Sequence, residues 1–175
     1  MALVKPVLFQ IAGYQNSGKT TLVTTLIEHL SATGLKIATV KHHGHGGKPD
    51  ILESKDSGRH IKAGAAVSLV EGGGRIIIQA ENGLWTLAEE IEILSSFKTD
   101  LILIEGYKNE PYPKAVILRD EADLELLERL QHTKVIFCRD QELVNQLQHL
   151  DLPVFNTDDP NGLKWITAYI ENQNR

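Results

Sequence analysis

The sequence predicts an α/β domain with an open, mostly parallel β-sheet and helices on both of its faces. Short, almost uninterrupted apolar runs, typical of strands buried on both faces, recur along the chain. Segments with apolar residues at helical spacing follow most of these runs, so strands and helices alternate. Since no internal repeat, low-complexity tract or interdomain linker interrupts this alternation, we expect residues 1–175 to form a single domain.

Each expected element has its own local signal. The expected strands cover residues 7–12, 37–40, 66–70, 75–79, 101–104, 115–118, 135–138 and 154–155. The expected helices cover residues 22–30, about 54–64, 87–94, 124–130 and 143–150, and the last begins at residue 160. Gly34 is suited to end the first helix, and Asp159-Pro160 to begin the last. The three glycines at 72–74 predict a hairpin, which either extends the main sheet in the antiparallel direction or forms a dimerisation arm.

The sequence contains the phosphate-binding loop pattern G-x-x-x-x-G-K-[ST] without a mismatch, at Gly13-Tyr14-Gln15-Asn16-Ser17-Gly18-Lys19-Thr20. It lies between the first expected strand and the first expected helix, where such a loop belongs, which argues against a chance match in a glycine-rich turn. Backbone N–H groups would surround the phosphates, and Lys19 would neutralise the outer ones. We therefore predict a three-layer P-loop NTPase fold and include Thr21 in the nucleotide site.

A nucleotide phosphate site of this kind also needs Mg²⁺. Thr20 supplies a hydroxyl ligand, and an acidic partner is expected at the carboxyl end of a neighbouring strand. This rule favours Glu105 over Asp100, which precedes the same strand. Asp56 could either bind Mg²⁺ and orient an attacking water or be an acid placed favourably at a helix N-terminus. Lys19 and Asp56 are the candidate catalytic residues.

A cationic, imidazole-rich tract follows the second expected strand and contains Lys41, His42, His43 and His45. Three interpretations stay open for it. The histidines could bind a metal, the glycine-rich tract could be a solvated loop, or Lys41 with the imidazoles could bind a phosphate or a dithiolene-bearing pterin.

Asp140 is a candidate for contacting the base of a bound nucleotide. GTPases often bind guanine with an Asp that follows an Asn-Lys or Thr-Lys pair, and here the corresponding segment reads Cys138-Arg139-Asp140. The alternative role of Asp140 is the N-cap of the next helix.

The composition excludes several classes of protein and of binding partner. The formal net charge of −5 argues against nucleic-acid or acidic-membrane partners, although a local basic pocket remains compatible with it. Cys138 is the single cysteine, so neither an intrachain disulfide nor a cysteine zinc site is expected. The N-terminus does not resemble a signal peptide, and the longest apolar runs are too short to span a membrane. We therefore expect a cytoplasmic protein.

These residues together resemble the molybdopterin-guanine dinucleotide biosynthesis protein B (MobB) family. The resemblance rests on the phosphate loop, Lys41-His42 with the following histidines, and Lys55-Asp56-Ser57 with Lys62-Ala63-Gly64-Ala65. It also rests on Leu101–Lys108, which ends in Glu-Gly-Tyr-Lys, and on Val116–Asp120. It spans essentially the whole chain, and the combination of these segments is far more selective than the phosphate loop alone.

The resemblance implies a homodimeric GTP-binding protein that acts late in molybdenum cofactor biosynthesis. Such a protein assists a separate nucleotidyltransferase that attaches GMP to molybdopterin, and it hydrolyses GTP weakly. It implies GTP and Mg²⁺ as ligands, with molybdopterin as a candidate bound substrate. By position, the resemblance assigns Gly13–Thr20 to binding the phosphates and Asp140 to contacting guanine. It assigns Thr20 and Glu105 to binding Mg²⁺, with Asp56 near the same site. Lys41, His42, His43 and His45 become candidates for a substrate-facing loop.

Two other classes of protein share parts of this pattern. An ATP-dependent ligase or kinase that resembles dethiobiotin synthetase would use a similar phosphate loop, loop Asp and strand-end Glu-Gly with Mg²⁺. A metallochaperone GTPase would account for the histidines, although the histidine loop lacks thiolate ligands. Nucleotide preference separates the ligase from the adapter, and nickel or zinc binding separates the metallochaperone.

Overall fold

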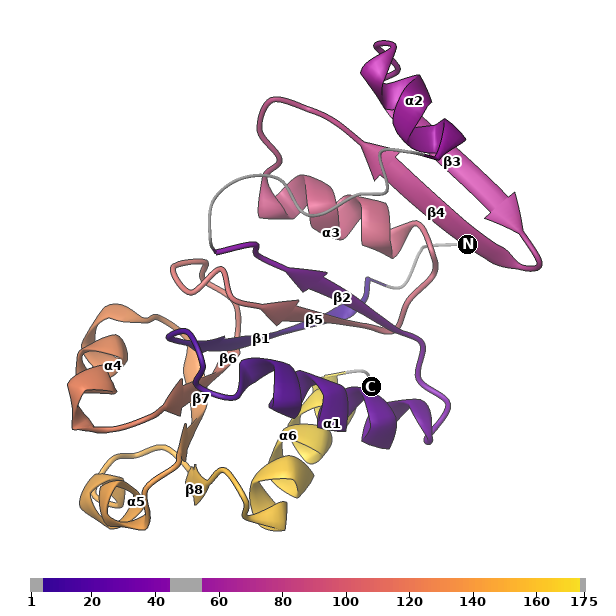
Figure 1. Ribbon diagram of the computed structural model, residues 1–175. Coiled ribbons are helices and arrows are strands. Elements are labelled where there is room, and N and C mark those ends of the chain that lie inside the picture. The colour runs from indigo at the N-terminus through magenta and orange to yellow at the C-terminus, as the bar shows by residue number, and fades with distance from the viewer. Residues whose placement is uncertain (1–4, 45–54, 174–175) are drawn as a thin grey trace. The chain divides into compact units, whose positions relative to one another are not determined.

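The computed structural model describes residues 5–44 and 55–173, and thin grey traces mark the other residues in Figure 1. The chain divides into two compact units. The larger unit consists of Met1–His42 and Leu87–Arg175, and the smaller unit consists of His43–Thr86. The expectation that residues 1–175 form one domain stays a prediction.

The larger unit is built on a parallel sheet of six strands in the order β2-β5-β1-β6-β7-β8. The strands are β1 (Val7–Gly13), β2 (Ile37–Lys41), β5 (Leu101–Glu105), β6 (Lys114–Leu118), β7 (Thr133–Cys138) and β8 (Val154–Asn156). Strands β5 and β6, which lie on either side of β1 in the sheet, are buried along their whole length. This burial explains why their sequences are almost continuously apolar rather than alternating.

Helices cover both faces of this sheet. They are α1 (Lys19–Ser31), α3 (Leu87–Ser95), α4 (Glu125–Arg129), α5 (Gln141–Leu147) and α6 (Pro160–Gln173), with a 3₁₀ turn η1 (Glu121–Leu124) before α4. Apolar residues of α1 and α6 pack on one face, which includes Phe9 and Ile11, and Figure 1 shows these two helices side by side. Apolar residues of α3, α4 and α5 pack on the other face. The predicted three-layer α/β fold is therefore confirmed.

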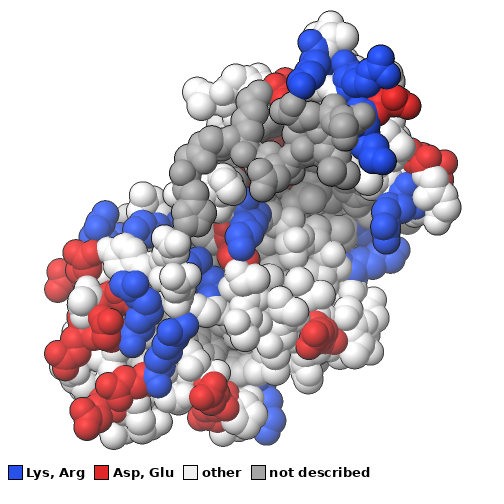
Figure 2. All heavy atoms as spheres, viewed as in Figure 1, with Lys and Arg blue, Asp and Glu red and all other residues white. Residues whose placement is uncertain are grey.

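The smaller unit contains helix α2 (Asp56–Lys62) and a hairpin of β3 (Val67–Gly72) and β4 (Arg75–Ala80). The hairpin turns through Gly73 and Gly74, which both have positive φ. In the part of the chain that the structure describes, β3 and β4 pair with each other in a two-stranded sheet of their own. The alternative in which the hairpin extends the main sheet was therefore wrong. Figure 2 shows Lys and Arg side chains gathered over α2.

The local signals placed the helix ends well. Gly34 has φ +93° and donates its N–H to Ser31 O at 3.0 Å, where α1 ends. Helix α6 begins at Pro160, and Asp159 Oδ1 accepts a hydrogen bond from Asn161 N at 2.9 Å. The helix expected at about 54–64 is shorter, and residue 54 lies outside the described residues.

Candidate nucleotide-binding site

The phosphate loop connects the end of β1 to the start of α1, and its path requires glycine at two positions. Gly13 has φ +154°, and a Cβ there would lie 2.7 Å from both Ile117 O and Ser17 Oγ. Gly18 has φ +100°, in the region that side-chain-bearing residues avoid. The two glycines of the motif therefore allow the backbone to turn tightly between the sheet and the helix.

The loop leads directly into the N-terminus of α1. Gly18 is the N-cap, and no side chain caps this helix end. The first N–H groups of α1 thus have no capping side chain, and the positive end of the helix dipole lies at the loop. Ser17 is fully buried, and its hydroxyl has no hydrogen-bond partner among the described residues. These groups are suited to bind the anionic oxygens of a phosphate chain.

Lys19 folds back over the loop. Its Nζ donates a hydrogen bond to Tyr14 O at 2.6 Å. Burial lowers the pKa of Lys19 from the ordinary lysine value, whereas Glu105 raises it and Lys41 lowers it further. The ammonium of Lys19 is thus partly desolvated, which strengthens its attraction for an anion.

Thr20, Lys41 and Glu105 meet at the carboxyl ends of β2 and β5. The Thr20 hydroxyl donates to Glu105 Oε1 at 2.6 Å, and Lys41 Nζ lies 2.9 Å from the same carboxylate oxygen. Lys41 Nζ also donates to Thr20 Oγ1 at 3.2 Å. A hydroxyl and a carboxylate are the hard oxygen donors that Mg²⁺ prefers, so these residues fit the expected metal. The side chain of Glu105 is 9% exposed.

The turn after β5 is fixed by a buried residue that sequence reasoning missed. Gln10 on β1 is fully buried, and its Nε2 donates to Gly106 O at 2.7 Å and to Tyr107 O at 2.6 Å. Gly106 has φ +90°, which turns the chain away directly after Glu105. The signal was present as a glutamine inside an apolar run. Asp100 lies at the opposite end of β5, where it accepts a hydrogen bond from Lys36 N.

The four residues of the cationic tract have different surroundings. Lys41 belongs to the Thr20–Glu105 cluster described above, and the His42 ring packs against Tyr107 with centroids 4.9 Å apart. His43 belongs to the smaller unit, and His45 lies outside the described residues. No group of three or more His, Cys, Asp or Glu suited to a metal ion occurs in residues 5–44 and 55–173. The metal interpretation of the histidines thus gains no support from the described residues.

Further basic side chains gather around the loop, although the chain as a whole is acidic. Arg139 Nη2 donates to Asn16 O at 2.6 Å, and Arg119 Nη1 donates to Gln15 O at 3.4 Å. Lys108 Nζ lies 4.3 Å from the centre of the Tyr14 ring. Together with Lys19 and Lys41, these residues place positive charge around the phosphate loop, which suits it to bind a polyphosphate. Sequence reasoning did not assign Lys108 or Arg139 to the site, because they follow other strands.

Asp140 caps a helix. Its Oδ1 accepts a hydrogen bond from Glu142 N at 2.9 Å at the start of α5, as the alternative interpretation expected. Its role in contacting guanine stays a prediction. Asp56 is the first residue of α2 in the smaller unit, and its carboxylate lies 3.6 Å from Arg59 Nη1. Its proposed part in Mg²⁺ binding also stays a prediction.

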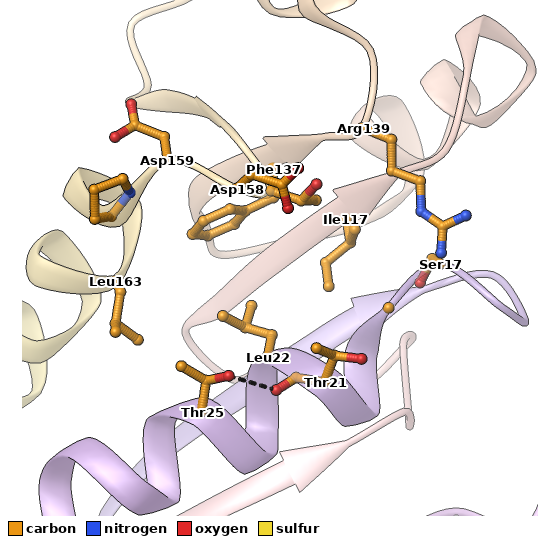
Figure 3. A pocket seen from close by; sticks show the side chains of 13 residues that line it. Ser17, Thr21, Leu22, Thr25, Ile117, Phe137, Arg139, Asp158, Asp159 and Leu163 are labelled. Atoms are coloured by element: carbon orange, nitrogen blue, oxygen red, sulfur yellow. Dashed lines mark hydrogen bonds between the residues drawn. The ribbon is translucent and has the colours of Figure 1, made fainter.

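A pocket of about 350 Å³ lies beside the phosphate loop and between α1, β7 and the segment that joins β8 to α6. Figure 3 shows its lining side chains. Ser17, Gly18 and Thr21 form its edge toward the loop, and Arg139 and Asp158 also line it. Asp140 is not among its lining residues. A nucleotide whose phosphates occupy the loop could extend its sugar and base into this space.

The fold and the loop define a nucleotide-binding protein of the P-loop class. The model of the family described as "MobB: Molybdopterin guanine dinucleotide synthesis protein B" matches residues 8–139. The chain belongs to this family.

Relatives of known name extend the match over the whole chain. A "Probable molybdopterin-guanine dinucleotide biosynthesis adapter protein" of Bacillus subtilis (strain 168) is 41% identical over 99% of this chain and 99% of its own length. The adapter protein of Escherichia coli (strain K12) is 31% identical over 95% of both chains. The crystal structure of Bacillus subtilis MobB has a TM-score of 0.81 at 42% identity and covers 93% of this chain and 96% of its own. A nickel-bound HypB structure from Helicobacter pylori, with a TM-score of 0.51 at 16% identity, shares the fold alone.

Proposed function

We propose that this chain is a GTP-binding adapter in the biosynthesis of molybdopterin guanine dinucleotide. It would bind a molybdopterin nucleotidyltransferase and assist the attachment of GMP to molybdopterin. The observation that carries this proposal is the full-length match to the adapter protein of Bacillus subtilis, in a chain whose phosphate-loop motif is complete. The alternative of an ATP-dependent ligase or kinase is not favoured by any of these relatives.

The proposed ligands are GTP and Mg²⁺. Residues Gly13–Thr20 and Thr21 would bind the phosphates through backbone N–H groups and the Lys19 ammonium. Thr20 and Glu105 would hold Mg²⁺, with Asp56 as a further candidate ligand. When bound, Mg²⁺ neutralises charge that develops on the phosphate oxygens. Lys19 and Asp56 are the residues proposed to act in a slow hydrolysis of GTP, Lys19 by stabilising negative charge and Asp56 by orienting water.

The basic tract is proposed to face the second substrate. Lys41, His42, His43 and His45 would bind the phosphate of molybdopterin through charge and imidazole N–H groups. Lys108 lies near the phosphate loop, as its contact with the Tyr14 ring indicates. No helix within the described residues has the length and apolar character needed to cross a membrane. We place the protein in the cytoplasm, where a biosynthetic adapter would meet its partner.

A homodimer formed through the β3–β4 hairpin is part of the proposal. Exposed aliphatic side chains occupy both strands of this hairpin: Val67, Leu69, Val70, Ile76, Ile77 and Ile78. Their exposed fractions lie between 42% and 61%, which is unusual for six neighbouring aliphatic residues of a monomer. An unpaired hairpin edge also offers hydrogen-bonding groups to a second copy.

The adapter role is tested by titrating the molybdopterin nucleotidyltransferase of the same organism into this protein with GTP and Mg²⁺ present, and again without nucleotide. We expect a complex by calorimetry or light scattering, with higher affinity in the presence of GTP. The variant Lys19→Ala is the matched control, since it removes the phosphate contact and should abolish the effect of GTP. If no complex forms under either condition, the adapter proposal is contradicted.

A further inference from the structure

The pocket beside the phosphate loop is lined by both apolar and polar side chains, as a nucleoside-binding pocket requires. Leu22, Ile117, Phe137 and Leu163 supply apolar surface, whereas Thr21, Arg139 and Asp158 supply polar groups. A planar base buries apolar faces and presents a polar edge, so a pocket with both kinds of surface suits it. The inference that follows rests on the proposed function, because it assumes that a nucleoside triphosphate occupies the loop.

The segment after β8 is held in place by its own hydrogen bonds. Asn156 Nδ2 donates to Arg139 O at 3.0 Å, and Asn156 Oδ1 accepts from Asp158 N at 3.0 Å. Thr157 N donates to Cys138 O at 2.9 Å, and Asp159 N donates to Asn156 O at 3.0 Å. These bonds join the segment to the end of β7. The backbone of Asp158 therefore has a defined position on the pocket.

Three aspartates stand near this end of the sheet, and two of them have structural roles. Asp140 caps α5 by accepting from Glu142 N, and Asp159 caps α6 by accepting from Asn161 N. The carboxylate of Asp158 has no hydrogen bond or ion pair with any residue in the described ranges 5–44 and 55–173. In Figure 3 the Asp159 carboxylate points away from the other lining side chains, whereas Asp158 lies nearer the middle of the group. Asp158 is thus the aspartate on this pocket whose carboxylate oxygens are unoccupied by described residues.

We propose that Asp158 determines guanine specificity by binding the Watson–Crick edge of the base. An ionised carboxylate is an acceptor only, with two oxygens side by side. Guanine presents two adjacent donors, the ring N1–H and the 2-amino group, which match these oxygens. Adenine presents the N1 acceptor beside its amino group, so one carboxylate oxygen would face a lone pair. Asp158 therefore favours guanine and penalises adenine.

Arg139 lines the same pocket as Asp158. Its guanidinium is anchored to the loop by the 2.6 Å hydrogen bond from Nη2 to Asn16 O. A planar guanidinium and its aliphatic stem pack well against the face of an aromatic ring. Arg139 would therefore support the face of the purine while Asp158 binds its edge. Because both residues are joined through Asn156, the two contacts would be set by one rigid segment.

The test exchanges the hydrogen-bonding pattern at residue 158. The variant Asp158→Asn presents one acceptor and one donor, which matches xanthine, whose C2 carbonyl replaces the amino group of guanine. We expect calorimetric titration with Mg²⁺ to show GTP binding weakened about 10- to 100-fold and xanthosine triphosphate binding strengthened by a similar factor. Asp158→Ala should lose the GTP preference without gaining xanthosine triphosphate.

Matched controls separate this residue from its neighbours. Asp159→Asn keeps a capping side chain and should leave the preference for GTP unchanged. Asp140→Asn tests the other candidate for the guanine contact, and a switch toward xanthosine triphosphate in that variant would assign the contact to Asp140. Inorganic triphosphate should bind Asp158→Asn as it binds the unaltered protein, because it uses the loop alone. The proposal is overturned if Asp158→Asn keeps its preference for GTP, or if Asp140→Asn shows the switch. Equal binding of ATP and GTP by the unaltered protein would instead contradict the proposed function, so the two failures are distinguishable.

Discussion

Lys41 Nζ lies 2.9 Å from Glu105 Oε1, and the same ammonium lies 3.2 Å from the hydroxyl of Thr20. A cation of the protein thus contacts both residues that are proposed to hold Mg²⁺. Because Glu105 is almost fully buried, its negative charge needs a positive partner nearby. We infer that Lys41 and Mg²⁺ compete for the Glu105 carboxylate, so the metal site and the basic tract are coupled.

The first prediction concerns the metal dependence of nucleotide binding. Glu105→Gln should reduce the gain in GTP affinity on adding Mg²⁺ by about tenfold or more, since it removes the charged oxygen ligand. The affinity measured without Mg²⁺ should stay the same or rise. Calorimetric titration of GTP with Mg²⁺ and with a chelator measures both quantities.

Asp100→Asn is the control for this variant, because Asp100 lies at the other end of the same strand and accepts a hydrogen bond from Lys36 N. It should leave the Mg²⁺ dependence unchanged. An identical Mg²⁺ effect in Glu105→Gln and in the unaltered protein would refute the assignment of Glu105 to the metal.

The second prediction concerns acid stability. Hydrogen bonding from Arg119 lowers the pKa of Asp123, a buried carboxylate that receives Arg119 Nη2 at 2.7 Å and Nε at 2.9 Å. Since the folded pKa lies below the unfolded value of about 3.9, the carboxylate stabilises the fold above that pH. This stabilisation is lost as pH falls through the folded pKa.

Asp123→Asn should therefore lower the free energy of unfolding by about 2 kcal/mol at neutral pH, a figure reduced because Arg119 is 37% exposed. The difference should shrink below about pH 4. Urea unfolding at neutral pH and at low pH measures it. Asp120→Asn, which keeps a capping side chain on η1, should change stability little. A loss of equal size at both pH values would argue against this account.

The strand and helix pattern could be predicted from the sequence because buried parallel strands and amphipathic helices leave local signals. Gly34, Asp159 and the phosphate loop are examples in which a few neighbouring residues determine the backbone. The contacts of Arg139 with Asn16 and of Gln10 with Tyr107 could not be predicted in this way. These contacts join residues 123 and 97 positions apart, and the order of the strands is what brings them together.

The position of the proposed base-binding residue likewise depends on strand pairing rather than on a local motif. Asp140 occupies the sequence position where a guanine-binding aspartate is expected, but its carboxylate caps α5. Asp158 carries no motif, since its neighbours Thr157 and Asp159 suggest only a turn before a helix. Its place on the pocket depends on how β8 pairs with β7, which local sequence does not specify.

The third prediction concerns the oligomeric state. Replacing residues 66–79 by a short turn should convert the proposed homodimer to a monomer, because it removes the exposed aliphatic side chains of both strands. Light scattering measures the mass of each form. A milder variant, Leu69→Lys with Ile78→Lys, places charges on paired positions of the hairpin and should have the same effect. A dimer that persists in both variants would place the interface elsewhere.

The most direct test of the account is calorimetric titration of GTP and ATP with Mg²⁺ into the unaltered protein and into Lys19→Ala. Lys19 Nζ lies on the phosphate loop, 2.6 Å from Tyr14 O. Removing this ammonium should therefore weaken phosphate binding directly. The account predicts roughly micromolar binding of GTP, much weaker binding of ATP, and loss of both in Lys19→Ala. Binding of ATP as tight as GTP or tighter would contradict it and favour the ligase or kinase alternative.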